Sequence, residues 1–232
     1  MNLLAIDTAT EACSAALLLD HQLIERFEIA PRQHNQLILS MVQSVLDEAD
    51  LNLNALDGIA FGAGPGSFTG IRIAAGVAQG LAFGLGLQVA PISTLKAMAF
   101  AAFSKKTHEL AAVAIDARME EIYWGVYRRQ TDESLHALIE DQVIRPEDVL
   151  IPDGEDLLAV GTGWATYRDV LTSKTQNRNI IMEPQTFPRA SAIAQLGALV
   201  LAHGEGVPPE SVLPLYLRNN VAKKMAERFR VE

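Results

Sequence analysis

The glycine-rich segment 61–70 is the part of the chain whose residue types and spacing could bind a phosphate group. It connects a short apolar run to a long apolar stretch, and Ser67 is a good N-cap for the helix that we expect to begin there. Glycines at alternate positions, among them Gly64 and Gly66, let the backbone approach a ligand closely. The segment lacks the Lys of a P-loop and the third Gly of the dinucleotide fingerprint. It is therefore either a phosphate cradle or a tight turn whose glycines serve packing.

Asp7 and Asp116 are the second candidates for chemistry, because each ends an apolar, strand-like run. The Ala-Ile-Asp sequence of 5–7 recurs at 114–116. A strand that ends in Asp and leads into a turn resembles the plan by which the actin, sugar-kinase and Hsp70 superfamily places a carboxylate beside ATP phosphates and metal. In a purely structural role, the same carboxylates would satisfy turn amides at the strand ends. The candidate remnants of a nucleotide site are thus Asp7, Gly64, Gly66, Ser67 and Asp116.

The histidines give no sign of a metal site or a catalytic triad. None of the five forms a pair at helical spacing, and no Ser-His-Asp or His-Glu-x-x-His arrangement is evident. His34 stands at the start of the first amphipathic helix, where we expect a capping or surface role. Cys13 lies in an apolar run and is expected in the core of a strand. The sequence therefore predicts neither a bound metal nor a cofactor.

The composition predicts a folded protein of the cytoplasm. Of the 232 residues 49% are hydrophobic, which is ample for a core, and the single cysteine fits a reducing compartment. A net charge of −9 argues against a protein that binds nucleic acid on its own, and the basic residues of 223–230 are expected in a solvated tail. The N-terminus shows no secretory signal. The apolar stretch 71–87 carries Arg72 and four glycines, which disfavours a membrane span.

The chain repeats one plan twice, which predicts an α/β protein of duplicated domains with mixed sheets flanked by helices. In the first half, strand-like segments precede an amphipathic helix and then the strand, loop and helix around the glycine-rich segment. From Leu110 the plan begins again, and the Gly-x-Gly of 62–64 has a counterpart at 161–163. Similarity over this length indicates two domains rather than a solenoid. We place the domains at 1–106 and 107–232.

The helix after the glycine-rich segment carries Gly76, Gly80 and Gly84 at four-residue steps. Each interior glycine costs a helix about 1 kcal/mol relative to Ala, so a close packing contact should offset it. The neighbour in that contact is the sheet, the first helix or a second protein chain. We expect one face of the helix to pack internally and the other, with positions of the first helix, to form a protein interface. The residues assigned to this interface are Leu37, Met41, Val45, Ile73, Val77, Gly80 and Leu81.

Several motifs together resemble the bacterial TsaB family, also called YeaZ, over nearly the whole chain. They stand at 4–10, 31–34, 61–72, 76–82, 116–118, 161–164 and 216–219. The combination of Gly-Pro-Gly-Ser-Phe-Thr-Gly with the later Asp-Ala-Arg and Tyr-Leu-Arg-Asn is more specific than any one motif. The resemblance implies a subunit of the bacterial system that installs threonylcarbamoyl on tRNA. The modified base is the adenosine that follows the anticodon in tRNAs reading codons that begin with A.

The resemblance also implies the partners. The chain would bind TsaD directly, a sister protein of the same fold that transfers the group, and would meet the ATPase TsaE and tRNA only through that complex. Alone, it would form a homodimer through the helices of the N-terminal domain. TsaD binds a metal through two histidines at i and i+4; here Thr94 and Met98 occupy those places, so metal-centred chemistry should be absent. The alternative is an independent enzyme, either an ATP-dependent phosphotransferase using Asp7 and Asp116 or a glycoprotease-like peptidase.

Overall fold

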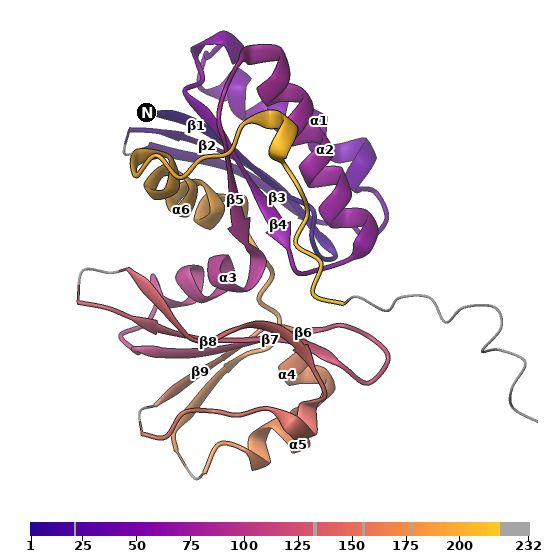
Figure 1. Cartoon of the computed structure of the whole chain (residues 1–232), viewed down its shortest axis with the longest axis vertical. Coiled ribbons are helices and arrows are strands. Elements are labelled where there is room, and N and C mark those ends of the chain that lie inside the picture. Colours follow the sequence, from indigo (N-terminus) through magenta and orange to yellow (C-terminus); the bar gives the residue numbers. More distant parts are fainter. Residues whose placement is uncertain (21, 132–133, 155, 177, 219–232) are drawn as a thin grey trace, which may run out of the picture.

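The computed structural model describes residues 1–20, 22–131, 134–154, 156–176 and 178–218. These residues form two lobes with helix α3 (Thr94–Phe103) between them (Figure 1). The basic residues at 223–230, which were predicted to form a tail, lie outside the described residues, as does Asn219 of the Tyr-Leu-Arg-Asn motif.

The first lobe is built on a five-stranded mixed sheet. Its strands are β1 (Asn2–Asp7), β2 (Ala12–Leu19), β3 (Gln22–Ile29), β4 (Gly58–Gly64) and β5 (Val89–Ser93). They lie in the order β3-β2-β1-β4-β5. Strands β1, β2 and β3 pair antiparallel, and β1, β4 and β5 are parallel. The parallel strands all end at the edge of the sheet that faces the second lobe, which is where ligands bind in open α/β sheets.

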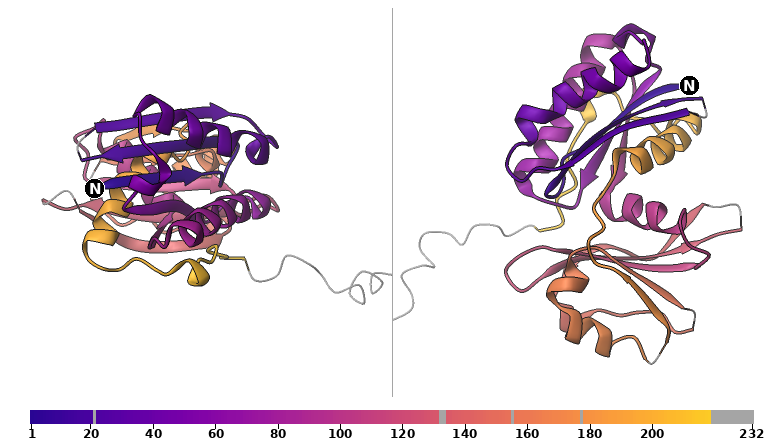
Figure 2. Two further views of the ribbon diagram at one scale, coloured as in Figure 1. Left: turned by 90° about the horizontal axis from the view of Figure 1, so that it is seen from above. Right: turned by 180° about the vertical axis from the view of Figure 1, so that it is seen from behind.

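Helices cover both faces of this sheet (Figure 2). They are α1 (His34–Glu48), the 3-10 helix η1 (Leu53–Ala55), α2 (Phe68–Leu85) and α6 (Ala190–Ala202). Successive side chains of a strand point to opposite faces, so one strand serves two cores. In β1, Leu4 and Ile6 pack with α1 and α2. Leu3 and Ala5 of the same strand pack with α6.

The second lobe repeats the plan of the first. Its strands are β6 (Leu110–Asp116), β7 (Ile122–Arg129), β8 (Leu135–Ile144), β9 (Leu157–Val160) and β10 (Ile180–Glu183), in the order β10-β9-β6-β7-β8. The antiparallel and parallel pairs recur as in the first sheet. This repetition confirms the predicted α/β fold of duplicated domains with mixed sheets flanked by helices.

The helices of the second lobe also cover both faces of its sheet. Helix α3 packs on the face toward the first lobe, against Ala111 and Val113. The opposite face is covered by Trp164 and Leu171, which stand on two short helices. The remaining helical elements are η2 (Pro146–Asp148), α4 (Gly163–Thr166), α5 (Arg168–Ser173) and η3 (Pro209–Ser211).

Residues 190–218 return to the first lobe, which differs from the division expected after residue 106. The two sheets do separate between α3 and β6, but α6 packs on the first sheet and the chain after it bridges to β5. Arg189 fixes the crossing, because its Nε and Nη2 donate to Glu25 of β3 at 2.9 and 2.5 Å. The physical reason is that the first sheet is apolar on both faces and needs a helix on each.

Helix α2 is long and apolar enough to cross a membrane by length and composition, with a mean hydropathy of 1.3 over 18 residues. In this fold it lies along the first sheet. Its buried face is made of small residues, among them Ala74, Ala78 and Ala82, which pack into the core beneath the helix. Core packing on one face thus gives a structural reason for its apolar composition.

Candidate functional site

A cleft of about 600 Å³ lies between the two lobes, at the ends of β1, β4 and β6. The first lobe contributes the glycine-rich loop and the start of α1, and the second lobe contributes the turn that follows β6. Residues 213–218, which we call the C-terminal strap, run from the first lobe to the junction of the lobes (Figure 1) and line one side of the cleft. Of the five candidate remnants of a nucleotide site, Gly66, Ser67 and Asp116 line this cleft.

The glycine-rich loop packs tightly on the turn between β1 and β2. A Cβ placed on Gly66 would lie 2.3 Å from the carbonyl oxygen of Ala9. The amide of Ser67 donates to that same oxygen at 2.7 Å, and the Ser67 hydroxyl caps α2 by accepting from the amide of Gly70 at 3.2 Å. The N-cap prediction is confirmed. Because the Ser67 amide is used inside the lobe, the geometry favours the packing role of the glycines over a phosphate cradle.

Gly64 lies outside the residues that line the cleft, against the C-terminal strap. Its φ of +115° is a conformation that residues with a Cβ rarely adopt, and a Cβ there would lie 2.8 Å from the Leu215 carbonyl oxygen. Beside it, the Leu215 amide donates to the Ala63 carbonyl at 2.7 Å. Gly64 therefore serves the docking of the strap rather than the binding of a ligand.

Asp7 is completely buried and does not line the cleft, so in this conformation its carboxyl does not face the cleft. Its Oδ1 accepts from the Ala9 amide at 3.1 Å, which is the structural role considered for this residue. Its Oδ2 has no hydrogen-bond partner among the residues that the structure describes. Burial raises the pKa of Asp7 to about 7, and the Ala9 hydrogen bond opposes that rise.

Asp116 does lie in the cleft, but its charge is paired. Its Oδ1 accepts from the Arg118 amide at 2.9 Å and its Oδ2 from the Arg118 guanidinium at 2.8 Å. Arg118 also reaches toward the first lobe, with 3.6 Å between its Nη2 and the Glu11 carboxylate. The Asp116 carboxylate thus stabilises the turn after β6 and orients Arg118, which also contacts the first lobe.

The hairpin tip between β6 and β7 holds an unfavourable backbone conformation at the mouth of the cleft. Arg118, Met119 and Glu120 have φ of +61°, +56° and +60°. The left-handed conformation costs about 1–2 kcal/mol for each residue with a Cβ. The strap braces the tip, because Arg218 donates to the Arg118 carbonyl at 3.3 Å and pairs with Glu121. Strain held in place by neighbours in this way is typical of functional surfaces.

An arginine that stacks on one aromatic ring and donates to the hydroxyl of another ties the strap to the first turn of α2. The Arg72 guanidinium lies 3.7 Å from the Phe68 ring centre, and its Nε donates to the Tyr216 hydroxyl at 2.7 Å. The Phe68 and Tyr216 rings are 5.8 Å apart. Sequence reasoning missed this cluster. The Tyr-Leu-Arg motif was the available signal, but nothing in it told which element it would meet.

The positions that correspond to the TsaD histidine pair are core positions here. Thr94 is fully buried, and Met98 packs between α3 and the second sheet. Across the described ranges, no group of three His, Cys, Asp or Glu side chains could hold a metal ion. The residues at this place therefore do not fit a metal.

His34 does not have the capping or surface role expected for it. It is the first residue of α1 after Gln33, which makes no side-chain cap, and it is only 8% exposed. Its ring borders the cleft, while its Nε2 is buried without a partner within the described part of the chain.

The outer face of α2 is open at its glycines. A Cβ placed on Gly76, Gly80 or Gly84 would meet nothing within 4 Å. These glycines are therefore not required by packing within the chain. At 75% exposed, Phe83 extends the same open face.

Two of the residues assigned to the protein interface are not on the surface. Met41 is 8% exposed and Val45 is 0% exposed, because both project from α1 into the core of the first lobe. Leu37, Ile73, Val77 and Leu81 are partly buried at the edge of the same core, and Gly80 is exposed. Helical periodicity marks an apolar stripe but does not distinguish a core stripe from an interface stripe.

Two lobes of the same strand order around a cleft define an α/β protein with an actin-like duplicated arrangement. The family model described as TsaD, tRNA N6-adenosine threonylcarbamoyltransferase, matches residues 24–226. The tRNA threonylcarbamoyladenosine biosynthesis proteins TsaB of Escherichia coli (strain K12) and Haemophilus influenzae are each 40% identical to this chain. The first alignment covers 97% of both chains, and the second covers 97% of this chain and 96% of the relative.

A solved structure agrees with these matches. The structure called YeaZ from Pseudomonas aeruginosa superposes with a TM-score of 0.86 at 44% identity, covering 93% of this chain and 99% of that one. The chain belongs to the TsaB (YeaZ) family, within the wider group that the TsaD family model describes.

Proposed function

We propose that this chain is a non-catalytic subunit that binds and activates TsaD. TsaD would transfer threonylcarbamoyl to the adenosine following the anticodon in tRNAs reading codons that begin with A. The observation that carries the proposal is the open glycine face of α2, where a Cβ added to Gly76, Gly80 or Gly84 would meet no described residue within 4 Å. The printed names of the relatives, tRNA threonylcarbamoyladenosine biosynthesis protein TsaB, supply the process.

The open face fits a close helix contact with another chain. Each glycine lowers helix stability by about 1 kcal/mol relative to Ala, and no close contact with the described residues offsets that cost. A partner helix can approach closely where Cβ atoms are absent, with Phe83 and the partly buried Ile73, Val77 and Leu81 as apolar borders. A partner with the same fold would give a pseudo-twofold heterodimer. A second copy of this chain would give a twofold homodimer in its absence.

The cleft supports a role without catalysis. Asp7 is buried behind the loop, Asp116 is paired with Arg118, and the Ser67 amide bonds within the lobe. No cofactor is proposed. We place the chain in the cytoplasm, away from membranes, where it would meet TsaE and tRNA as members of the TsaD complex.

The test is association with TsaD together with nucleoside analysis of tRNA. Gly80→Glu adds a charge where nothing in this chain is displaced, so the variant should fold. It should lose TsaD binding and lower threonylcarbamoyladenosine in cellular tRNA. Leu199→Glu, an equivalent change at an exposed position of α6, is the control. Normal TsaD binding and normal modification with Gly80→Glu would contradict the proposed interface. If the isolated chain hydrolysed ATP or cleaved a peptide over many turnovers, that result would instead favour the independent enzyme.

A further inference from the structure

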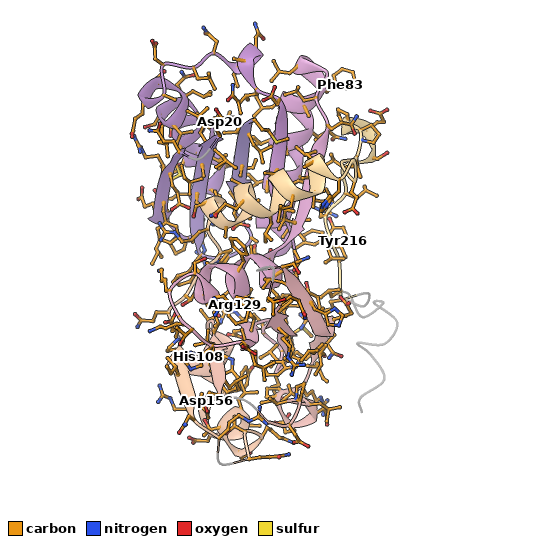
Figure 3. All side chains as sticks on the ribbon, turned by 90° about the vertical axis from the view of Figure 1, so that its left-hand side faces the viewer. Asp20, Phe83, His108, Arg129, Asp156 and Tyr216 are labelled. Atoms are coloured by element: carbon orange, nitrogen blue, oxygen red, sulfur yellow. The ribbon has the colours of Figure 1, made fainter. Side chains whose placement is uncertain are left out.

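A second groove, of about 480 Å³, lies at the junction of the lobes beside the end of α3. It is formed by the last turn of α3, the segment that follows it, the facing ends of β7 and β8, and Gln195 of α6. Arg129, one of its lining residues, is labelled in Figure 3 at the level where the two lobes meet. Neither the cleft nor the open face of α2 includes this groove.

The groove has the opposite charge to the chain as a whole. The net charge of the chain is −9, yet Lys105, Lys106 and Arg129 line the groove, and none of the lining residues that the structure describes is Asp or Glu. Lys106 forms an ion pair with Glu183 on the rim, with 3.5 Å between its Nζ and the Glu183 Oε1. Lys105 is exposed and makes no ion pair within the described ranges. A polyanion would be repelled by the net negative charge of the chain and attracted to the cations of this groove.

The end of α3 holds the Arg129 side chain and the backbone of residues 105 and 106 in place. The Arg129 Nη1 donates to the Phe103 carbonyl at 3.2 Å, and its guanidinium lies 5.5 Å from the Phe103 ring centre. The Lys105 and Lys106 amides donate to the carbonyls of Ala102 and Phe103, both at 3.2 Å. These bonds cover the negative end of the helix. A guanidinium has five N–H donors, so Arg129 keeps donors for an anion after this bond.

The floor of the groove is apolar. Phe100 and Leu135 are partly buried there, and Phe103 lies beneath them. Cations on the wall and an aromatic floor are the combination by which proteins hold a single strand of nucleic acid. The phosphates meet the charges, and a ribose or base meets the ring.

We infer that this groove binds the phosphodiester backbone of RNA, and that through it the subunit itself contacts the tRNA held by the complex. This inference rests on the proposed function, which brings a tRNA to the chain. Two phosphates at Lys105 and Arg129 would add a modest increment to binding by the whole assembly. That agrees with a net charge too negative for the chain to bind RNA alone.

The test compares two double neutralisations in the assembled complex with TsaD. Lys105→Gln with Lys106→Gln removes two charges from the groove. Arg168→Gln with Lys174→Gln removes two from α5 and the residue that follows it, on the opposite face of the second sheet. The measurement is tRNA affinity from 50 to 200 mM salt. Each lost phosphate contact lowers the slope of log K against log salt by about 0.7–0.9.

The groove variant loses the phosphate contact at Lys105 and should therefore bind tRNA about 5- to 8-fold more weakly near 0.1 M salt, with a slope lower by about 0.7–0.9, while the α5 variant matches the wild type. Unchanged affinity and slope in the groove variant, or equal losses in both variants, would overturn the inference. So would loss of TsaD binding by the groove variant, since the groove would then contact protein.

Two further outcomes separate the sources of failure. If inorganic phosphate shifts the amide NMR signals of 105–106 in the isolated chain as strongly as tRNA does in the complex, the groove is a free-phosphate site and the RNA inference is overturned. If the wild-type chain forms no complex with TsaD, the proposed function fails and the inference fails with it.

Discussion

Asp7 and Gly62 lie so close together that a Cβ on residue 62 would be 1.8 Å from the Asp7 Oδ2. Asp7 is the last residue of β1. The neighbouring strand β4 has Gly62 beside it, and glycine, which has no side chain, leaves room for the carboxyl. The carboxyl is thereby enclosed in the first lobe, with the Ala9 amide as its donor. This contact explains why the carboxyl at this strand end is part of the core.

Gly62→Ala should destabilise the protein. The new methyl group would collide with Asp7, which the Ala9 bond holds in place, and would lie 3.2 Å from the Cδ1 of Ile193. Overpacking of this kind costs about 1–3 kcal/mol, measurable by urea unfolding. Gly76→Ala is the matched control, since a Cβ there meets nothing. It should stabilise the helix by about 0.5–1 kcal/mol, and equal effects of the two changes would contradict the packing argument.

The stability of the protein should fall as the pH rises from about 4 to about 7. The pKa of Asp7 is raised from 3.8 to about 7, so over that range the folded state keeps a proton that the unfolded state has lost. The unfolded state then binds fewer protons, and unfolding becomes easier as pH rises. The change is a few kcal/mol at most, at about 1.4 kcal/mol per pKa unit.

Asp7→Asn provides the check on this pH dependence. The amide keeps an oxygen for the Ala9 bond but does not titrate, so the difference in unfolding free energy between pH 5 and pH 8 should become smaller than in the wild type. An unchanged difference would assign the pH dependence to other groups.

Gly80→Ala should separate stability from association. The methyl group raises helix propensity by about 1 kcal/mol without meeting another atom, so thermal unfolding should occur at a higher temperature. The same methyl group would hold a partner helix away, and the affinity for TsaD, measured by calorimetry, should fall. A variant that is more stable and binds equally well would show that the partner contacts another surface.

Tyr216→Phe should loosen the C-terminal strap. The change removes the hydrogen bond from Arg72 but keeps the ring beside Phe68, and such a bond contributes about 0.5–1.5 kcal/mol. The Leu215 amide, which donates to Ala63, should then exchange with deuterium about 2- to 10-fold faster. Exchange at the wild-type rate would show that the strap is held by its other contacts.

Met119→Gly should relieve the hairpin tip. Met119 has a φ of +56° and its side chain is 70% exposed, so glycine loses little contact and adopts the backbone conformation readily. We expect a gain of up to about 1 kcal/mol in unfolding free energy. Met119→Val, with a branched Cβ, should act in the opposite direction. Two variants of the same stability would mean that the tip is not strained.

Several local elements and the duplicated plan could be predicted from the sequence. Strand-like segments were expected before the first amphipathic helix, Ser67 marked the start of α2, and the repeated Ala-Ile-Asp indicated a second lobe built like the first. These features depend on neighbours within a few residues, such as a cap bond or the two-residue period of a strand, so they can be inferred without knowing the fold.

Which apolar surfaces meet depends on the tertiary structure. No sequence pattern indicated that α6 covers the first sheet rather than the second. The same limit made Val45 look like an interface residue, although it is buried under α1, and left the enclosure of Asp7 by Gly62 undetected. Burial is set by contacts between segments far apart in sequence, and a helix stripe carries the same pattern whether its partner is a sheet or another protein.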